Sequence, residues 1–151
     1  MKLTSESFTH GEFIPIRYAA KGARGKNVSP ELSWADAPEG TASFAIICHD
    51  PDAPGKHGFL HWLVTDIAPD ISSAREGKAP KKSREWVTDA GAPGWYGPNP
   101  PHGKAHHYNF TVYALDVPAI ELPKGTPHLD VQAEIVKHTL DTAKLTGLYQ
   151  Q

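Results

Sequence analysis

Short apolar segments alternate with turns along most of the chain. Three of these segments are rich in Ile, Val, Phe, Trp and Tyr, which favour strands: Ser43–His49, Phe59–Ile67 and His107–Leu115. Apolar residues fill both the odd and the even positions of the first two segments, which is typical of central strands covered on both faces. A weaker strand is predicted over Phe13–Ala19. The pattern therefore predicts a mainly β protein whose central strands are buried.

The clearest helical pattern lies toward the end of the chain. Apolar residues there recur at spacings of four and three, which predicts a helix over Leu129–Thr146, and Gly147 follows as a natural stop. The predicted apolar stripe consists of Leu129, Ala133, Val136, Leu140 and Ala143. A shorter helix is predicted over Ile71–Lys78. Strands first and a helix last favour an antiparallel two-sheet β-sandwich with a C-terminal helix.

Length and charge narrow the class of protein. A chain of 151 residues can bury a core of its own, and we predict a single domain over residues 1–151. The formal net charge of −2 does not favour binding to nucleic acid or to an anionic membrane. Cys48 is the only cysteine, and its apolar neighbours predict a buried thiol. The N-terminus has no signal-like apolar region and no segment is long enough to span a bilayer, so we expect a cytoplasmic protein without an integral membrane segment.

Carboxylate and imidazole side chains gather near the ends of the predicted strands. Asp50 and Asp52 follow the first strand at i, i+2 spacing, and His61 lies within the second strand. Because side chains two apart share a face of a strand, His106 and Tyr108 are expected to point together. A histidine inside an apolar strand needs hydrogen-bond partners. Catalysis, a metal site and a binding pocket are all compatible with this cluster.

Local motifs give little support to metal or nucleophile chemistry. The chain has no H-E-x-x-H, no Cys-rich spacing, no G-x-S-x-G elbow and no P-loop. The stretch Gly91–Tyr108 is instead dense in Gly and Pro, and its backbone N–H groups could form a small anion-binding nest. We therefore predict no catalytic residue, no metal ligand and no cofactor.

Four motifs occur in an order and at a spacing that resemble a known family. They are NVSPELSW (Asn27–Trp34), APEGTASFAIICHDPDAP (Ala37–Pro54), FLHW (Phe59–Trp62) and YGPNPPHGKAHHY (Tyr96–Tyr108). Together they resemble the phosphatidylethanolamine-binding protein (PEBP) family, and most closely its bacterial branch, often called Raf-kinase-inhibitor-like proteins. The resemblance spans nearly the whole chain and implies two packed antiparallel sheets with a Greek-key element.

The resemblance also implies a pocket for phosphate, phosphorylated head groups or similar anions. Its lining, carried over motif by motif, consists of Asp50, Pro51, Asp52, Pro54, His61, Gly97, Pro98, Pro100, Pro101, His106 and Tyr108. Two positions depart from the family pattern. His107 replaces the usual Arg on the face opposite His106, which predicts the loss of a permanent charge and of an ion pair. Glu31 stands where Pro is common, away from the expected pocket.

Two classes of function follow from these residues. We predict a protein that binds a small phosphorylated or anionic ligand, in which one carboxylate orients a histidine and another accepts a group of the ligand. The alternative is a hydrolase or a metal-dependent enzyme that uses His61 or His106 as base and an aspartate as orienter. The resemblance further implies regulation of a protein partner, such as a kinase or a protease, and a homodimer by analogy.

Overall fold

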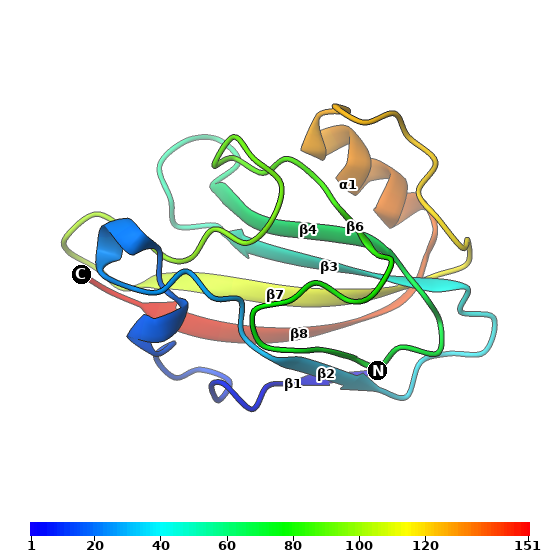
Figure 1. The fold of residues 1–151 in the computed structure, drawn as a ribbon, viewed down its shortest axis with the longest axis horizontal. Coiled ribbons are helices and arrows are strands. Elements are labelled where there is room, and N and C mark those ends of the chain that lie inside the picture. Colours follow the sequence, from blue (N-terminus) through cyan, green and yellow to red (C-terminus); the bar gives the residue numbers. More distant parts are fainter.

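Five strands form the larger of two antiparallel sheets in the computed structural model, which describes all of residues 1–151 (Figure 1). In spatial order they are β6 (Arg84–Glu85), β4 (Phe59–Ile67), β3 (Ser43–Asp50), β7 (His106–Leu115) and β8 (Thr139–Tyr149). The smaller sheet consists of β1 (Lys2–Thr4), β2 (Leu32–Ala35) and β5 (Ser73–Ala74). The single α-helix, α1 (His128–Lys137), covers the face of the large sheet opposite β1 and β2. This arrangement confirms the predicted two-sheet β fold with a helix near the C-terminus.

The large sheet buries side chains on both faces. The core on the side of the small sheet includes Leu32, Trp34, Phe44, Ile46, Cys48 and Trp62. The core under α1 includes Ala45, Ile47, Leu63, Val131 and Ile135. Neighbours along β3 alternate between the two cores, as the strand period of two requires. The structure therefore confirms both the central strands and the buried thiol, although a helix rather than a second sheet covers one of the two faces.

The strand β7 brings the predicted site residues to one end of the large sheet. His106, Tyr108 and Phe110 are buried on the face of the main core, whereas His107 is exposed on the other face, as the strand parity predicted. The strand β3 pairs with β4 on one side and with β7 on the other. The end of β3 and the beginnings of β4 and β7 therefore meet at one corner of the molecule.

The C-terminal helix is shorter than predicted. The structure has α1 only over His128–Lys137, and the residues from Thr139 onward form the eleven-residue strand β8 beside β7. The predicted apolar stripe was also wrong, because Leu129 and Val136 are exposed and α1 instead buries Val131 and Ile135. In β8 the buried positions alternate toward the end of the strand. None of the helices is both long enough and apolar enough to cross a membrane.

Two further predictions from the sequence were wrong. The expected strand over Phe13–Ala19 contains a 3-10 turn at Ile16–Tyr18 and a single bridge from Phe13 to β8. Pro15 lacks the N–H that a strand ladder needs, which explains the interruption. The expected helix over Ile71–Lys78 is a set of turns around the two residues of β5. Pairing with β2 therefore determines the conformation of this short segment more than helix propensity does.

Candidate functional site

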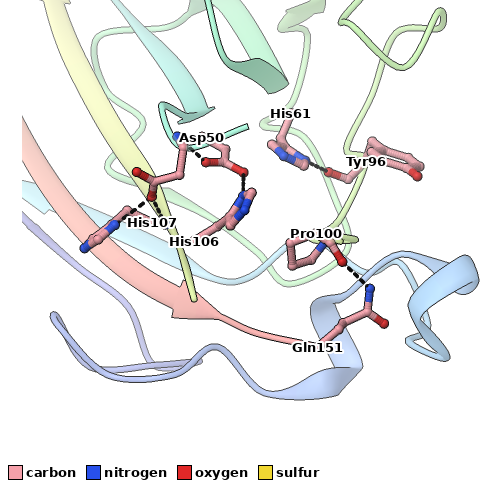
Figure 2. A network of polar contacts seen from close by, with 8 residues as sticks. Asp50, His61, Tyr96, Pro100, His106, His107 and Gln151 are labelled. Carbon is pink, nitrogen blue, oxygen red and sulfur yellow. Dashed lines mark hydrogen bonds and ion pairs between the residues drawn. The ribbon is translucent and has the colours of Figure 1, made fainter. Parts of the chain in front are cut away.

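The turn after β3 begins with Asp50, which is almost completely buried. One of its carboxylate oxygens accepts the backbone N–H of Asp52 at 2.8 Å, and the other lies 2.7 Å from Nδ1 of His106 (Figure 2). The chain returns into β4 through Gly58, whose φ is +64° and where a Cβ atom would lie 2.2 Å from the carbonyl oxygen of Asp50. Only glycine fits this close approach at a positive φ. The local sequence thus holds one carboxylate against one imidazole.

Asp52 forms a separate pair on the outer face of the sheet. Its Oδ2 accepts the backbone N–H of His107 at 2.7 Å and lies at the same distance from Nδ1 of that residue. The bond from the His107 backbone is the main reason that the pKa of the Asp52 carboxyl lies below its usual value. A histidine at position 107 therefore keeps a hydrogen bond to a carboxylate, and this contact is an ion pair only while the imidazole is protonated, so the expected loss of a permanent ion pair stays a prediction.

His61 extends from β4 into the same corner as His106. Its Nδ1 lies 2.5 Å from the carbonyl oxygen of Tyr96, and its ring stacks on the Tyr96 ring with centroids 5.9 Å apart. A second aromatic ring, that of Phe59, lies 4.7 Å away. Burial removes water from the imidazole and lowers the pKa of His61 to about 4. His61 is therefore neutral near pH 7.

Buried neutral His61 is expected to make folding stability depend on acid pH. In the unfolded chain its pKa is about 6.5, so between that value and about 4 the unfolded state binds more protons than the folded state. Stability from this source is complete above pH 6.5 and falls by about 3 kcal/mol as the pH is lowered to 4. Urea unfolding of the wild type and of His61→Asn at several pH values measures this loss as a change in their difference.

The exposed His57 offers a matched control, because its side chain makes no hydrogen bond. His57→Asn leaves the buried imidazole of His61 in place, so this variant is expected to lose stability on acidification as the wild type does. A difference between the wild type and His61→Asn that stays constant from pH 7 to pH 4 would contradict the assignment of a neutral buried imidazole.

A pocket of about 380 Å³ opens at this corner. Seven of the predicted site residues line it: Asp50, Pro54, His61, Pro100, Pro101, His106 and Tyr108. The remaining four, Pro51, Asp52, Gly97 and Pro98, do not line it. The structure thus brings together both histidines, the tyrosine and one of the two predicted carboxylates.

The predicted residues outside the pocket lie behind its wall or on another surface. Pro51 borders a separate hollow beside His49 and α1. The backbone N–H of Gly97 donates to Oδ1 of Asn27 at 2.7 Å, and the carbonyl of Pro98 accepts the N–H of Ala20 at 3.0 Å. Gly97 and Pro98 therefore attach the loop that carries Pro100 and Pro101 to the rest of the protein.

Six lining residues were missed from the sequence: Ala53, Phe59, Asp89, Ala90, Tyr96 and Asn99. Asp89 is the most consequential of these, since it adds a second carboxylate. Its oxygens lie 2.7 Å from the backbone N of Leu60 and 2.7 Å from Nε2 of His128. A carboxylate beside the tightly turned segment at Gly91 was visible in the sequence, but no local pattern pointed it toward the pocket.

The rim of the pocket is also attached to the last residue of the chain. The amide nitrogen of Gln151 donates to the carbonyl of Pro100 at 2.6 Å (Figure 2). It also donates to the side-chain oxygen of Asn99 at 3.0 Å. The carbonyl of Gln151 in turn accepts the N–H of Gly103 at 3.0 Å. These contacts hold the loop that forms one wall.

The side chains of the pocket provide acids and bases but no strong nucleophile. No serine, threonine, cysteine, lysine or arginine lines the cavity. Burial, with a smaller contribution from the charge of Asp50, raises the pKa of the Tyr108 hydroxyl well above its usual value, so this group keeps its proton. No group of three or more His, Cys, Asp or Glu side chains is arranged to hold a metal ion. The arrangement suits a guest that both accepts and donates hydrogen bonds.

Comparison with known proteins gives matches along the whole chain. The sequence model of a family described as phosphatidylethanolamine-binding protein matches residues 4–150. The UPF0098 protein YbhB of Escherichia coli (strain K12) is 36% identical, with 99% of each chain aligned. The UPF0098 protein of Aquifex aeolicus (strain VF5) is 40% identical over 100% of this chain and 89% of its own. The crystal structure of Escherichia coli YbcL, described as a new member of the mammalian PEBP family, matches with a TM-score of 0.95 and 32% identity, covering 99% of this chain and 98% of YbcL.

Proposed function

Because the chain belongs to the phosphatidylethanolamine-binding protein family, we propose that it binds a small phosphorylated or otherwise anionic ligand in the pocket between His61 and His106. The observation that carries the proposal is the buried pair of Asp50 and His106. The carboxylate accepts a hydrogen bond from Nδ1 of the imidazole, so that Nε2 is left without a protein partner at the pocket. Protonated at Nε2, this ring would donate a charge-assisted hydrogen bond to an oxyanion.

Binding without turnover is the function that this lining supports best. The pocket offers two imidazoles, two carboxylates and a protonated tyrosine hydroxyl, but none of the serine, threonine, cysteine or lysine side chains that most often act as nucleophiles. No observation favours the alternative of a hydrolase or a metal-dependent enzyme. Regulation of a kinase or a protease, and a homodimer, stay predictions from the family resemblance.

Calorimetric titration of the protein with phosphate and with O-phosphorylethanolamine tests the proposal. We expect saturable binding of one ligand per chain at pH 6. His106→Ala should weaken binding by about a hundredfold or more, since it removes a charge-assisted hydrogen bond and leaves the Asp50 carboxylate facing the anion.

The neighbouring residue provides a matched control. His107→Ala alters an exposed imidazole on the opposite face of the same strand and is expected to change the affinity by less than about threefold. Absence of binding by the wild type throughout pH 5.5–8, or an equal loss in both variants, would contradict the proposed site.

A further inference from the structure

His61 presents a hydrogen-bond acceptor to the pocket. A carbonyl oxygen can only accept, so the 2.5 Å contact with Tyr96 requires the proton of the neutral ring to be on Nδ1. The other nitrogen, Nε2, then carries a lone pair, and no protein group donates to it. Only Nε1 of Trp34 is both fully buried and unpaired among the side-chain nitrogens and oxygens, so Nε2 of His61 is reached from the pocket.

The charges around the pocket disfavour a fully ionised guest. The carboxylates of Asp50 and Asp89 line the cavity, and no lysine or arginine lines it. Each carboxylate is held by the protein, Asp50 by Asp52 and His106, and Asp89 by Leu60 and His128. These hydrogen bonds weaken the repulsion between the two carboxylates and a bound anion, but they do not turn it into an attraction. A ligand with one negative charge therefore fits this environment better than a dianion.

An acceptor and a donor thus stand on two sides of the cavity. His61 can accept a hydrogen bond from an O–H group of the ligand, whereas His106, when protonated, can donate a hydrogen bond to an ionised oxygen. The hydroxyl of Tyr108, on the same face of β7 as His106, is a second donor. A tetrahedral oxyanion that keeps one O–H group satisfies both kinds of partner at once.

We propose that the pocket selects oxyanions that carry an ionisable O–H group, such as the monoanion of a phosphate monoester. Nε2 of His61 accepts the hydrogen bond from this O–H group and thereby determines the specificity. This inference rests on the proposed function and narrows its class of ligand. Sulfate esters and phosphodiesters lack this O–H group and would leave Nε2 of His61 without a hydrogen-bond donor. Binding sites strongly reject ligands that leave a buried polar group unpaired.

The ionisable groups that face His61 come from four parts of the chain. They are Asp50 at the end of β3, His106 and Tyr108 on β7, Asp89 in the turn after Trp86, and Tyr96 in the loop after Gly91. His49 of β3 does not line the pocket, but its charge when protonated also disfavours a charged His61. Of these, His106 is the group that the proposed function uses in its protonated form. The test must therefore separate a proton on the ligand from a proton on the protein.

Methyl phosphate and methyl sulfate form the decisive pair of ligands. Their tetrahedral groups are alike, and at pH 5 both are mainly monoanions, because a phosphate monoester loses its second proton only near pH 6. Calorimetry with the wild type is expected to show binding of methyl phosphate and at least about hundredfold weaker binding of methyl sulfate. Equal binding of the two would overturn the inference and leave the proposed function standing. Failure of methyl phosphate and of inorganic phosphate to bind would overturn both.

A series over pH separates the two possible sources of the proton. Methylphosphonate keeps its last proton to a higher pH than methyl phosphate does. The pH at which binding is half lost should therefore be higher for the phosphonate, and an identical midpoint for the two ligands would assign the controlling proton to the protein and overturn the inference. A diester head group, glycerophosphoethanolamine, should bind as weakly as methyl sulfate, whereas binding as tight as that of O-phosphorylethanolamine would count against selection for the monoester.

His61→Phe connects the selectivity to one residue. The aromatic ring keeps the packing against Phe59 and Tyr96 but has no lone pair. The ratio of the two affinities, methyl phosphate to methyl sulfate, should fall to within about threefold in this variant. A ratio as large as that of the wild type would show that a group other than His61 distinguishes the protonated ligand from the sulfate. The comparison of ligands on the wild type stands even if this variant folds poorly.

Discussion

Gly97→Ala is expected to lower the free energy of unfolding by roughly 3 kcal/mol or more. A Cβ atom at this position would lie 2.2 Å from the carbonyl oxygen of Tyr18, 2.6 Å from the carbonyl carbon of Ala19 and 2.7 Å from the backbone nitrogen of Ala20. All three are backbone atoms, so no side-chain rotation relieves the overlap, and the loop must move away from the protein. Urea unfolding measures the loss, and calorimetry should show weaker ligand binding, because the same loop carries Pro100 and Pro101 into the pocket.

Gly22→Ala is the matched control for this substitution. Gly22 also lacks a positive φ, but the atom closest to its added Cβ is the amide nitrogen of Asn99, at 2.9 Å, at the end of a side chain that can turn away. We expect this variant to lose less than about 1 kcal/mol. Comparable losses in the two variants would indicate that close backbone contact at Gly97 is not what holds the loop.

His106→Ala is expected to lower the free energy of unfolding by about 3 kcal/mol at pH 7, which is the usual cost of removing one member of a buried pair. The side chain of Asp50 is only 3% exposed and that of His106 only 10%. Without the imidazole, the buried carboxylate loses its charged partner and keeps the N–H of Asp52, with the hydroxyl of Tyr108 nearby. Chemical denaturation followed by tryptophan fluorescence gives the loss directly.

A second substitution separates this effect from lost packing. Asp50→Asn in the His106→Ala background removes the uncompensated charge and still offers an oxygen to the N–H of Asp52. The double variant should therefore recover roughly 1–2 kcal/mol relative to His106→Ala. A double variant less stable than His106→Ala would mean that the cost comes from the cavity left by the ring.

The strands that build the site were predictable, because composition and burial reinforce each other there. The strands β3, β4 and β7 are rich in branched and aromatic residues, and the period of two correctly predicts that His106 and Tyr108 share one face. The motif carrying Asp50 and the loop carrying Pro100 were recognisable by resemblance. Contacts made within one strand or one turn leave a readable trace in the sequence.

Prediction from the sequence pattern failed for the C-terminal segment that was expected to be one long helix. Leu129, Val136 and Leu140 have helical spacing, but all three are exposed in the structure. Thr139–Tyr149 is a strand because the whole length of β7 is available as a partner, with pairs from His106↔Tyr149 to Leu115↔Thr139. Pairing with a strand more than twenty residues away outweighs a weak local helical preference.

The missed parts of the site depend on similarly distant contacts. Asp89 lines the pocket because the N–H of Leu60 and the imidazole of His128 hold it there. Asn99 is held by Gln151, and the two residues are 52 positions apart. The partners of Asp50 and Asp52 could not be assigned from the sequence for the same reason, since the register between β3 and β7 decides which histidine each carboxylate reaches.

That register has a consequence for how a ligand is received. Two neighbouring residues of β7 bind two carboxylates of one turn. The imidazole of His106 binds Asp50 from the inner face, and the backbone N–H of His107, which an alanine at this position would keep, binds Asp52 from the outer face. Because both carboxylates are bound, the turn that carries Asp50 keeps its conformation before a ligand binds. Little conformational entropy is then lost on association, and even a ligand of few atoms can be held by a small number of preorganised hydrogen bonds.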